Sequence, residues 1–191
     1  MPRLAGHNRG FSLQPRHARM PETETWTVGR LLTWTTDYLR KQGADTARLD
    51  AEVLLAMACG CQRIELYTRF DEQPAEENRV AFRELVRRRA EGAPVAYLVG
   101  HREFFSLSFR VTEDVLIPRP ETEFVVVELL DLARSLDRTD LRIADIGTGS
   151  GILAVCAAKN LPDCQVVAVD VSPAALEVAR ATHGEEHRET A

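Results

Sequence analysis

The chain has 191 residues, of which 45% are hydrophobic and 28% charged, enough to bury the core of one ordinary domain or of two small ones. This excludes a short peptide, and no apolar run approaches the roughly 20 residues that span a bilayer. The net charge of −5 disfavours a basic nucleic-acid-binding surface. The composition therefore predicts a soluble globular protein without a direct nucleic-acid or membrane partner.

Residues 1–25 mix Gly, Pro, His and Arg without any period, and we expect them to be a disordered leader. Met20 is a second candidate start, although an Arg-rich organelle presequence stays open as an alternative. The chain has four cysteines and no secretory hydrophobic segment. Reduced thiols and a cytoplasmic location are therefore predicted.

Residues 26–92 have helical spacing and are expected to form a small helical bundle. Thr27 is placed to cap the first helix, and Gly43 to end it. Three further helical segments are expected to begin near Thr46, Ile64 and just after Pro74. Their expected buried positions are Leu49, Val53, Leu54 and Met57 in the second helix, and Val80, Leu85 and Val86 in the fourth. We expect a solvated helix face at Arg87, Arg88 and Arg89, with the aliphatic part of one of these side chains packed against the protein.

After this bundle the pattern changes, and residues 93–117 are expected to be a hairpin linker. Its aromatic and β-rich run, 103–111, predicts two short strands about a turn at Ser106 and Leu107. Residues 118–191 then read as an incomplete α/β domain. The domain opens on IPRPETE at 117–123, whose prolines lead into a helix expected from Glu121 to Leu136.

The most informative stretch predicts a βαβα unit. Leu141–Ile146 and Val166–Val169 read as fully buried strands, Ile152–Lys159 as the helix between them, and Pro173 as the start of the next helix. Between the first strand and its helix lie the loop residues Gly147, Thr148, Gly149, Ser150 and Gly151. Glycines let a backbone approach a ligand closely, and Asp170 after the second strand could accept hydrogens from both hydroxyls of a ribose.

The spacing of the glycines bears on the ligand. A dinucleotide fingerprint needs a third glycine where this chain has Ile152, and no lysine follows the loop as a P-loop requires. The run DIGTGSG, with Asp145 ending the strand, is instead the pattern of S-adenosylmethionine enzymes. A nicotinamide-dependent oxidoreductase stays open as an alternative.

Three motifs together resemble the HemK family of release factor glutamine methyltransferases. They are LIPRPETE at 116–123, IADIGTGSG at 143–151 and VVAVDVSPAAL at 166–176, and the helical part is echoed in ARLDAEVLL at 47–55 and in GAPVAYLVGHREFFSLSF at 92–109. The resemblance implies a helical substrate-recognition domain and the first part of a class I, Rossmann-like methyltransferase domain. It also implies S-adenosylmethionine as cofactor and a peptide chain release factor as protein substrate, methylated on the glutamine amide of its Gly-Gly-Gln loop. Gly147 to Gly151 would then line the methionine part of the cofactor and Asp170 would hold its ribose.

One departure from the family concerns catalysis. The family's catalytic Asn-Pro-Pro-Tyr tetrapeptide occurs nowhere in these 191 residues, so the catalytic residues are unknown and a chain truncated before that motif is expected. A noncatalytic module that binds cofactor and release factor is therefore a second alternative. No metal site is expected at Cys59 and Cys61, since no histidine or second close cysteine pair accompanies them, and no general-base role is assigned to His101.

Overall fold

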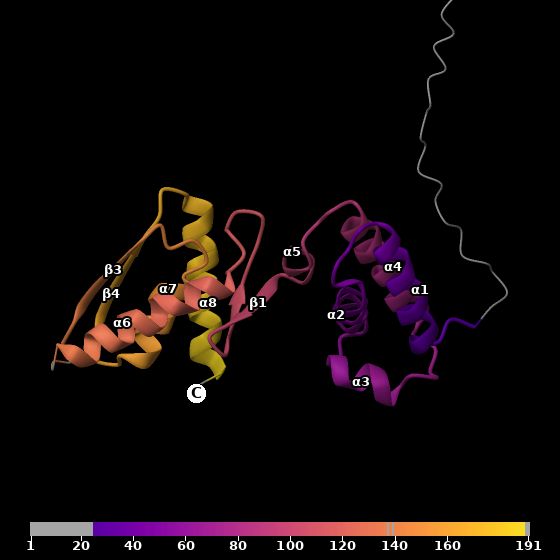
Figure 1. The fold of residues 1–191 in the computed structure, drawn as a ribbon, viewed down its shortest axis with the longest axis horizontal. Coiled ribbons are helices and arrows are strands. Elements are labelled where there is room, and N and C mark those ends of the chain that lie inside the picture. Colours follow the sequence, from indigo (N-terminus) through magenta and orange to yellow (C-terminus); the bar gives the residue numbers. More distant parts are fainter. Residues whose placement is uncertain (1–24, 137, 139, 190–191) are drawn as a thin grey trace, which may run out of the picture.

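The computed structural model describes residues 25–136, 138 and 140–189, with side chains described up to residue 182. The predicted disordered leader of residues 1–25 therefore lies outside the described residues, except for Thr25. Figure 1 shows two parts, a helical part and an α/β part, joined through a short helix and a hairpin. No helix in the described ranges is both long and apolar enough to cross a membrane.

The helical part contains α1 (Val28–Lys41), α2 (Ala47–Cys59), α3 (Arg63–Thr68) and α4 (Glu76–Ala90). Thr27 caps α1 as predicted, because its hydroxyl oxygen accepts the N–H of Arg30 at 3.3 Å. Trp26, Leu31, Leu32, Leu39, Leu54, Leu55, Leu66 and Phe82 are among the buried side chains of its core.

The predicted buried faces of α2 and α4 are partly wrong. Leu54 and Val86 are buried, but Leu49, Met57 and Val80 are 44%, 49% and 51% exposed. The structure turns α2 so that Asp50 and Glu52 are buried instead, each in contact with an arginine. The buried face of α2 thus includes acids that are paired with arginines, and hydrophobic spacing does not contain that information.

The hairpin consists of β1 (His101–Phe104) and β2 (Leu107–Arg110), paired antiparallel with Phe104 opposite Leu107. Its turn is at Phe105 and Ser106, with φ of 49° and 62°, one residue earlier than predicted. Two positive φ values match the twist of a two-residue hairpin, and this sequence lacks the glycine that normally marks such a turn. The short helix α5 (Val95–Val99), which precedes the hairpin, was not predicted.

The hairpin packs against the α/β part. Phe104 and Phe109 share a core with Val126 and Leu130 of α6 (Glu123–Ser135), which follows the single turn η1 (Pro120–Thr122). The carboxylate of Glu123 also accepts the N–H of Phe105 in the hairpin turn at 3.2 Å. The IPRPETE segment therefore fixes the hairpin as well as starting a helix. The predicted domain boundaries at 92/93 and 117/118 stay predictions.

The βαβα unit is formed by β3 (Arg142–Ile146), α7 (Ile152–Asn160), β4 (Gln165–Val169) and α8 (Pro173–Glu189). The two strands pair in parallel, with Ile146 opposite Val169, so both carboxyl ends lie at one edge. α7 packs against this sheet, and α8 packs against β2. The backbone of α8 continues as helix past Thr182, although the apolar period of the sequence ends there.

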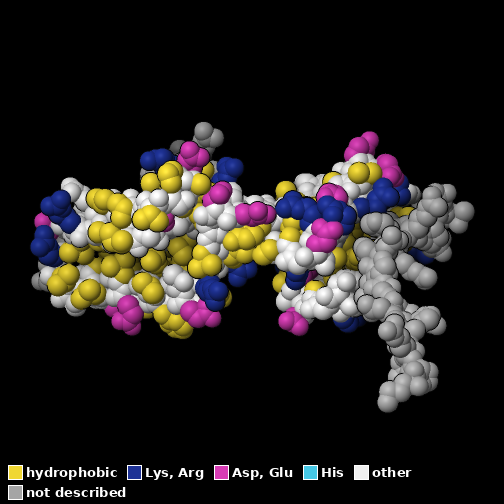
Figure 2. Space-filling model, turned by 90° about the horizontal axis from the view of Figure 1, so that it is seen from above, with side chains coloured by type: hydrophobic (Ala, Val, Ile, Leu, Met, Phe, Trp, Pro, Cys, Tyr) yellow, Lys and Arg dark blue, Asp and Glu magenta, His cyan; other side chains and the backbone are white. Residues whose placement is uncertain are grey.

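The prediction that β3 and β4 are fully buried is wrong for this chain. Ile146, Val167 and Val169 are 77%, 59% and 40% exposed. Within the described residues the sheet has two strands, so each strand keeps one unpaired edge and the face away from α7 is uncovered. Apolar residues of α6 are exposed too, among them Phe124 and Leu132. Figure 2 shows hydrophobic side chains gathered on the α/β part, whereas charged side chains of both signs are spread over the helical part.

Candidate functional site

The glycine loop connects β3 to α7 and takes a backbone path that only glycine adopts without strain. Gly147, Gly149 and Gly151 have φ of 78°, 54° and 83°. A Cβ atom added at Gly147 or Gly149 would have no atom within 4 Å. The space beside these two glycines is therefore open to a ligand, which could approach the backbone closely.

Hydrogen bonds within the protein hold this loop in shape. The N–H groups of Gly147 and Thr148 donate to the carbonyl oxygen of Val169 at 2.8 and 3.0 Å. The hydroxyl of Thr148 donates to the buried carboxylate of Asp145 at 2.7 Å. Asp145 thus stabilises the loop, and the Thr148 side chain is already occupied by an internal partner.

Asp170 joins the loop to the end of β4. One carboxylate oxygen accepts the N–H of Gly149 and the other accepts the N–H of Ser172, both at 2.9 Å. The hydrogen bonds from Ser172 and Gly149 lower the pKa of Asp170 below its ordinary value, which favours the ionised form. Each oxygen keeps lone-pair capacity for a further donor, so this carboxylate could hold a diol beside the open face of the loop.

The structure separates the predicted site residues into two groups. Gly147 is exposed, and Gly149 and Asp170 are half-buried at the carboxyl edge of the sheet, as their spacing predicted. Thr148, Ser150 and Gly151 are buried. A Cβ added at Gly151 would lie 3.2 Å from the Cβ of Ala179 in α8, so this glycine permits the close packing of the two helices.

A second group of functional interest, absent from the predictions, surrounds Glu52 on α2. Its buried carboxylate accepts hydrogen bonds from Arg48 Nε at 2.7 Å, from an Arg63 guanidinium nitrogen at 2.9 Å and from the hydroxyl of Tyr67. Burial favours a raised pKa, but the hydrogen bonds from Tyr67, Arg63 and Arg48 together lower the pKa of Glu52. The spacing of Arg48 and Glu52, four residues apart on a helix, was the one local signal for this cluster.

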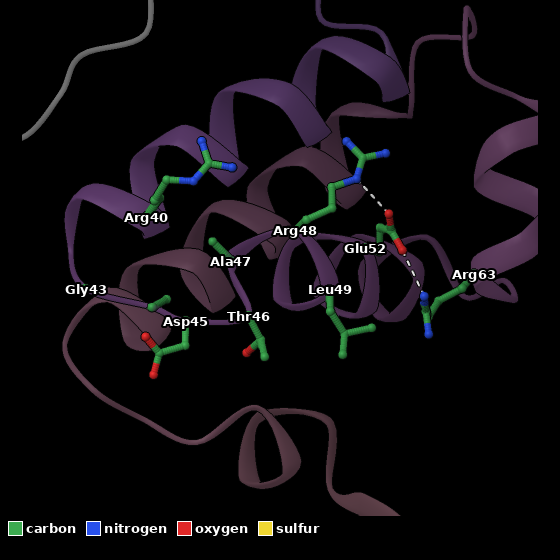
Figure 3. Close-up of a pocket in the computed structure, with 10 residues that line it drawn as sticks. Arg40, Gly43, Asp45, Thr46, Ala47, Arg48, Leu49, Glu52 and Arg63 are labelled. Atoms are coloured by element: carbon green, nitrogen blue, oxygen red, sulfur yellow. Dashed lines mark hydrogen bonds and ion pairs between the residues drawn. The ribbon is translucent and has the colours of Figure 1, made fainter.

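The Glu52 cluster borders a cavity of 710 Å³ between the end of α1, the first turns of α2 and the start of α3. Figure 3 shows Arg48 and Arg63 on either side of Glu52, with Arg40 and Asp45 farther along the cavity. The cavity belongs wholly to the helical part and does not include the glycine loop.

Comparisons with known proteins match both parts of the chain. The family model of the PrmC N-terminal domain matches residues 30–100, and that of the methyltransferase small domain matches residues 127–191. A "Release factor glutamine methyltransferase" of Rhodopirellula baltica is 64% identical over 157 residues, which are 81% of this chain and 53% of that protein. The chain belongs to the HemK family. The resemblance stated from the sequence motifs is thus confirmed, and the α/β architecture fits the class I methyltransferase fold of this family.

Two other members of the family are also named release factor glutamine methyltransferase. That of Geobacter sulfurreducens is 45% identical, over 82% of this chain and 54% of its own length, and that of Bacillus subtilis is 40% identical, over 81% and 54%. This HemK-family chain therefore spans about half the length of the curated relatives it matches.

Proposed function

We propose that this chain supplies the cofactor-binding part of an enzyme that methylates the side-chain amide of glutamine in the Gly-Gly-Gln loop of peptide chain release factors. The observation that carries the proposal is the pairing of Asp170 with the glycine loop through the N–H of Gly149 at 2.9 Å. The names of the curated relatives support the substrate. Four free cysteines support a reducing, cytoplasmic location.

The residues present fit S-adenosylmethionine as cofactor. Asp170 is ionised and fixed by two backbone donors, so its remaining lone pairs would accept the ribose hydroxyl hydrogens. Gly147 and Gly149 leave open space beside the backbone, where the methionine part of the cofactor would lie. When bound, S-adenosylmethionine supplies an activated sulfonium methyl group.

The substrate amide sets the remaining requirement. An amide nitrogen is a poor nucleophile because its lone pair is delocalised, so catalysis depends on alignment and on acceptors for its two N–H hydrogens. In the family these acceptors come from the Asn-Pro-Pro-Tyr tetrapeptide, which does not occur in these 191 residues. For the 191-residue polypeptide by itself, the missing tetrapeptide therefore favours a second function. In that function the chain binds cofactor and release factor but does not transfer a methyl group.

Calorimetric titration of the full chain with S-adenosylmethionine and with NAD tests the proposal. We expect saturable binding of S-adenosylmethionine alone, weakened about tenfold or more by Gly149→Ala, because the added Cβ occupies ligand space and strains the loop. Gly60→Ala is the matched control, since Gly60 has a similar φ of 60° and also has open space at its Cβ, but ends α2 in the helical part. Tighter binding of NAD, or equal affinity in the two glycine variants, would overturn the assignment.

A further inference from the structure

The Glu52 cluster holds two arginine side chains in fixed positions at the surface. The Glu52 side chain is 5% exposed, whereas those of Arg48 and Arg63 are 41% and 50% exposed. Arg48 also lies against the ring of Tyr67, with its guanidinium carbon 5.9 Å from the ring centroid. Because a guanidinium carries five N–H donors, each arginine keeps donors beyond those that contact Glu52.

The charge of the cluster leaves it attractive to an anion. One buried carboxylate stands between two guanidinium groups, so the cluster has one positive charge in excess. Among the described residues, Arg63 makes no other hydrogen bond or ion pair than the one to Glu52. Arg40, farther along the same cavity, is paired with Asp37 at 2.9 Å. Arg40 therefore has an acid of its own, whereas Arg48 and Arg63 share one carboxylate between them.

We propose that Arg48 and Arg63 bind the carboxylates of an acidic segment of a partner protein, seated in the cavity between α1, α2 and α3. Each guanidinium is planar and can donate two parallel hydrogen bonds to a carboxylate, and the buried Glu52 holds both groups in position. Lysine side chains would not provide this geometry. The inference goes beyond the proposed function and does not depend on it, because it concerns the helical part and is tested without cofactor.

The surroundings of the two arginines favour a protein segment over a nucleic acid. Leu49, in the lining, is 44% exposed, and Ile64, next to Arg63, is 68% exposed, so apolar side chains of a partner would find contacts beside the charged ones. Asp45 lies in the same lining, and Glu65, in the first turn of α3, is paired with Arg69. A phosphate backbone needs many unopposed basic groups along its path, whereas a short acidic segment needs only the two arginines that this cavity offers.

The test measures binding of a fluorescent peptide that alternates glutamate and leucine to the full 191-residue chain at low salt, by anisotropy. The reference peptide has glutamine in place of each glutamate. We expect Arg63→Gln to weaken binding of the glutamate peptide about tenfold, and Arg63→Lys to weaken it less, because a charge is kept while the fork is lost. Both variants alter a half-exposed side chain, and circular dichroism checks their fold.

Arg83→Gln is the matched control. Arg83 has a 51% exposed side chain and one ion pair, to Glu76 at 3.1 Å, but it lies on α4 outside the cavity. Unchanged peptide affinity in this variant, with the tenfold loss in Arg63→Gln, supports the proposal. The proposal would be overturned if both variants lost affinity equally, if the glutamine peptide bound as well as the glutamate peptide, or if the glutamate peptide did not bind. It would also be overturned if single-stranded oligothymidylate bound more tightly than the glutamate peptide and lost that affinity in Arg63→Gln.

Discussion

Asp170 is the side chain on which cofactor binding is expected to depend most. Both of its oxygens already accept backbone N–H groups, and a ribose diol would use what capacity remains. We expect Asp170→Ala to weaken S-adenosylmethionine binding roughly tenfold to a hundredfold, since hydrogen bonds to a charged acceptor are lost. Calorimetry measures this, with Asp163→Ala, an exposed aspartate just before β4, as control. Unchanged affinity in Asp170→Ala would remove the residue from the site.

The ion pairs of Glu52 are expected to contribute to the free energy of unfolding. Glu52→Gln weakens the hydrogen bonds from Arg48, Arg63 and Tyr67, but the two arginines are half-exposed and stay solvated, so we expect the free energy of unfolding at neutral pH to fall by about 1–2 kcal/mol. The pKa of Glu52 is lowered in the folded state, so its contribution is present above the unfolded pKa and is lost as pH falls through the folded one. The difference between wild type and variant should therefore shrink below about pH 4.

Urea unfolding at several pH values, followed by circular dichroism, checks this expectation. Glu84→Gln is the control, because Glu84 pairs with Arg87 on the exposed face of α4 and should change the stability little. A difference for Glu52→Gln that stays constant down to acid pH would contradict the assigned ionisation.

At the residue scale, local requirements were predictable and distant pairings were not. Gly149 and Asp170 follow from strand and loop spacing, because a tight strand-to-helix turn leaves few backbone solutions. The burial of Asp50 depends on Arg89, 39 residues away, at 2.8 Å. One arginine of 87–89 was expected to pack against the protein, and Arg89 is that residue, but no local pattern encodes its pairing with Asp50.

At the scale of elements, helix starts were easier to predict than buried faces. Thr27 caps α1 and Pro173 opens α8 as expected, since both are local backbone devices. The hairpin turn at Phe105 lacks the usual glycine signal, and the N–H of Phe105 is held by Glu123 from α6. The apolar runs of β3 and β4 predict strands that are covered on both faces. In the described residues these two strands pair only with each other and one helix packs on them, so one face stays exposed.

The exposed sheet predicts uneven local stability. β3 and β4 each have an edge without a partner in the described part of the chain, whereas α1 and α2 surround a buried core. We expect amides of β3 and β4 to exchange with solvent faster than those of α1 and α2. Hydrogen exchange read by mass spectrometry on a monomeric sample measures this. Equal protection in the two parts would show that the uncovered sheet is as stable as the bundle.

At the scale of the whole molecule, α5 and the segment after the hairpin connect the two parts. Leu98 of α5 belongs to the core of the bundle, while Ala96 and Tyr97 pack against Val115 and α8 in the α/β part. The hydroxyl of Tyr97 also donates to the carbonyl oxygen of Val115 at 2.8 Å. The two parts are therefore joined by packed side chains and a hydrogen bond as well as by the backbone.

The most direct test of this account is methyl transfer to an unmodified release factor in the presence of S-adenosylmethionine. Two proteins are compared, the 191-residue chain and a chimera in which it is continued by the C-terminal part of the Rhodopirellula baltica relative, and the mass of the Gly-Gly-Gln peptide is followed. The account predicts one added methyl group with the chimera, its loss in the Asp170→Ala chimera, and none with the 191-residue chain. Comparable transfer by the 191-residue chain, or no transfer by the chimera, would contradict it.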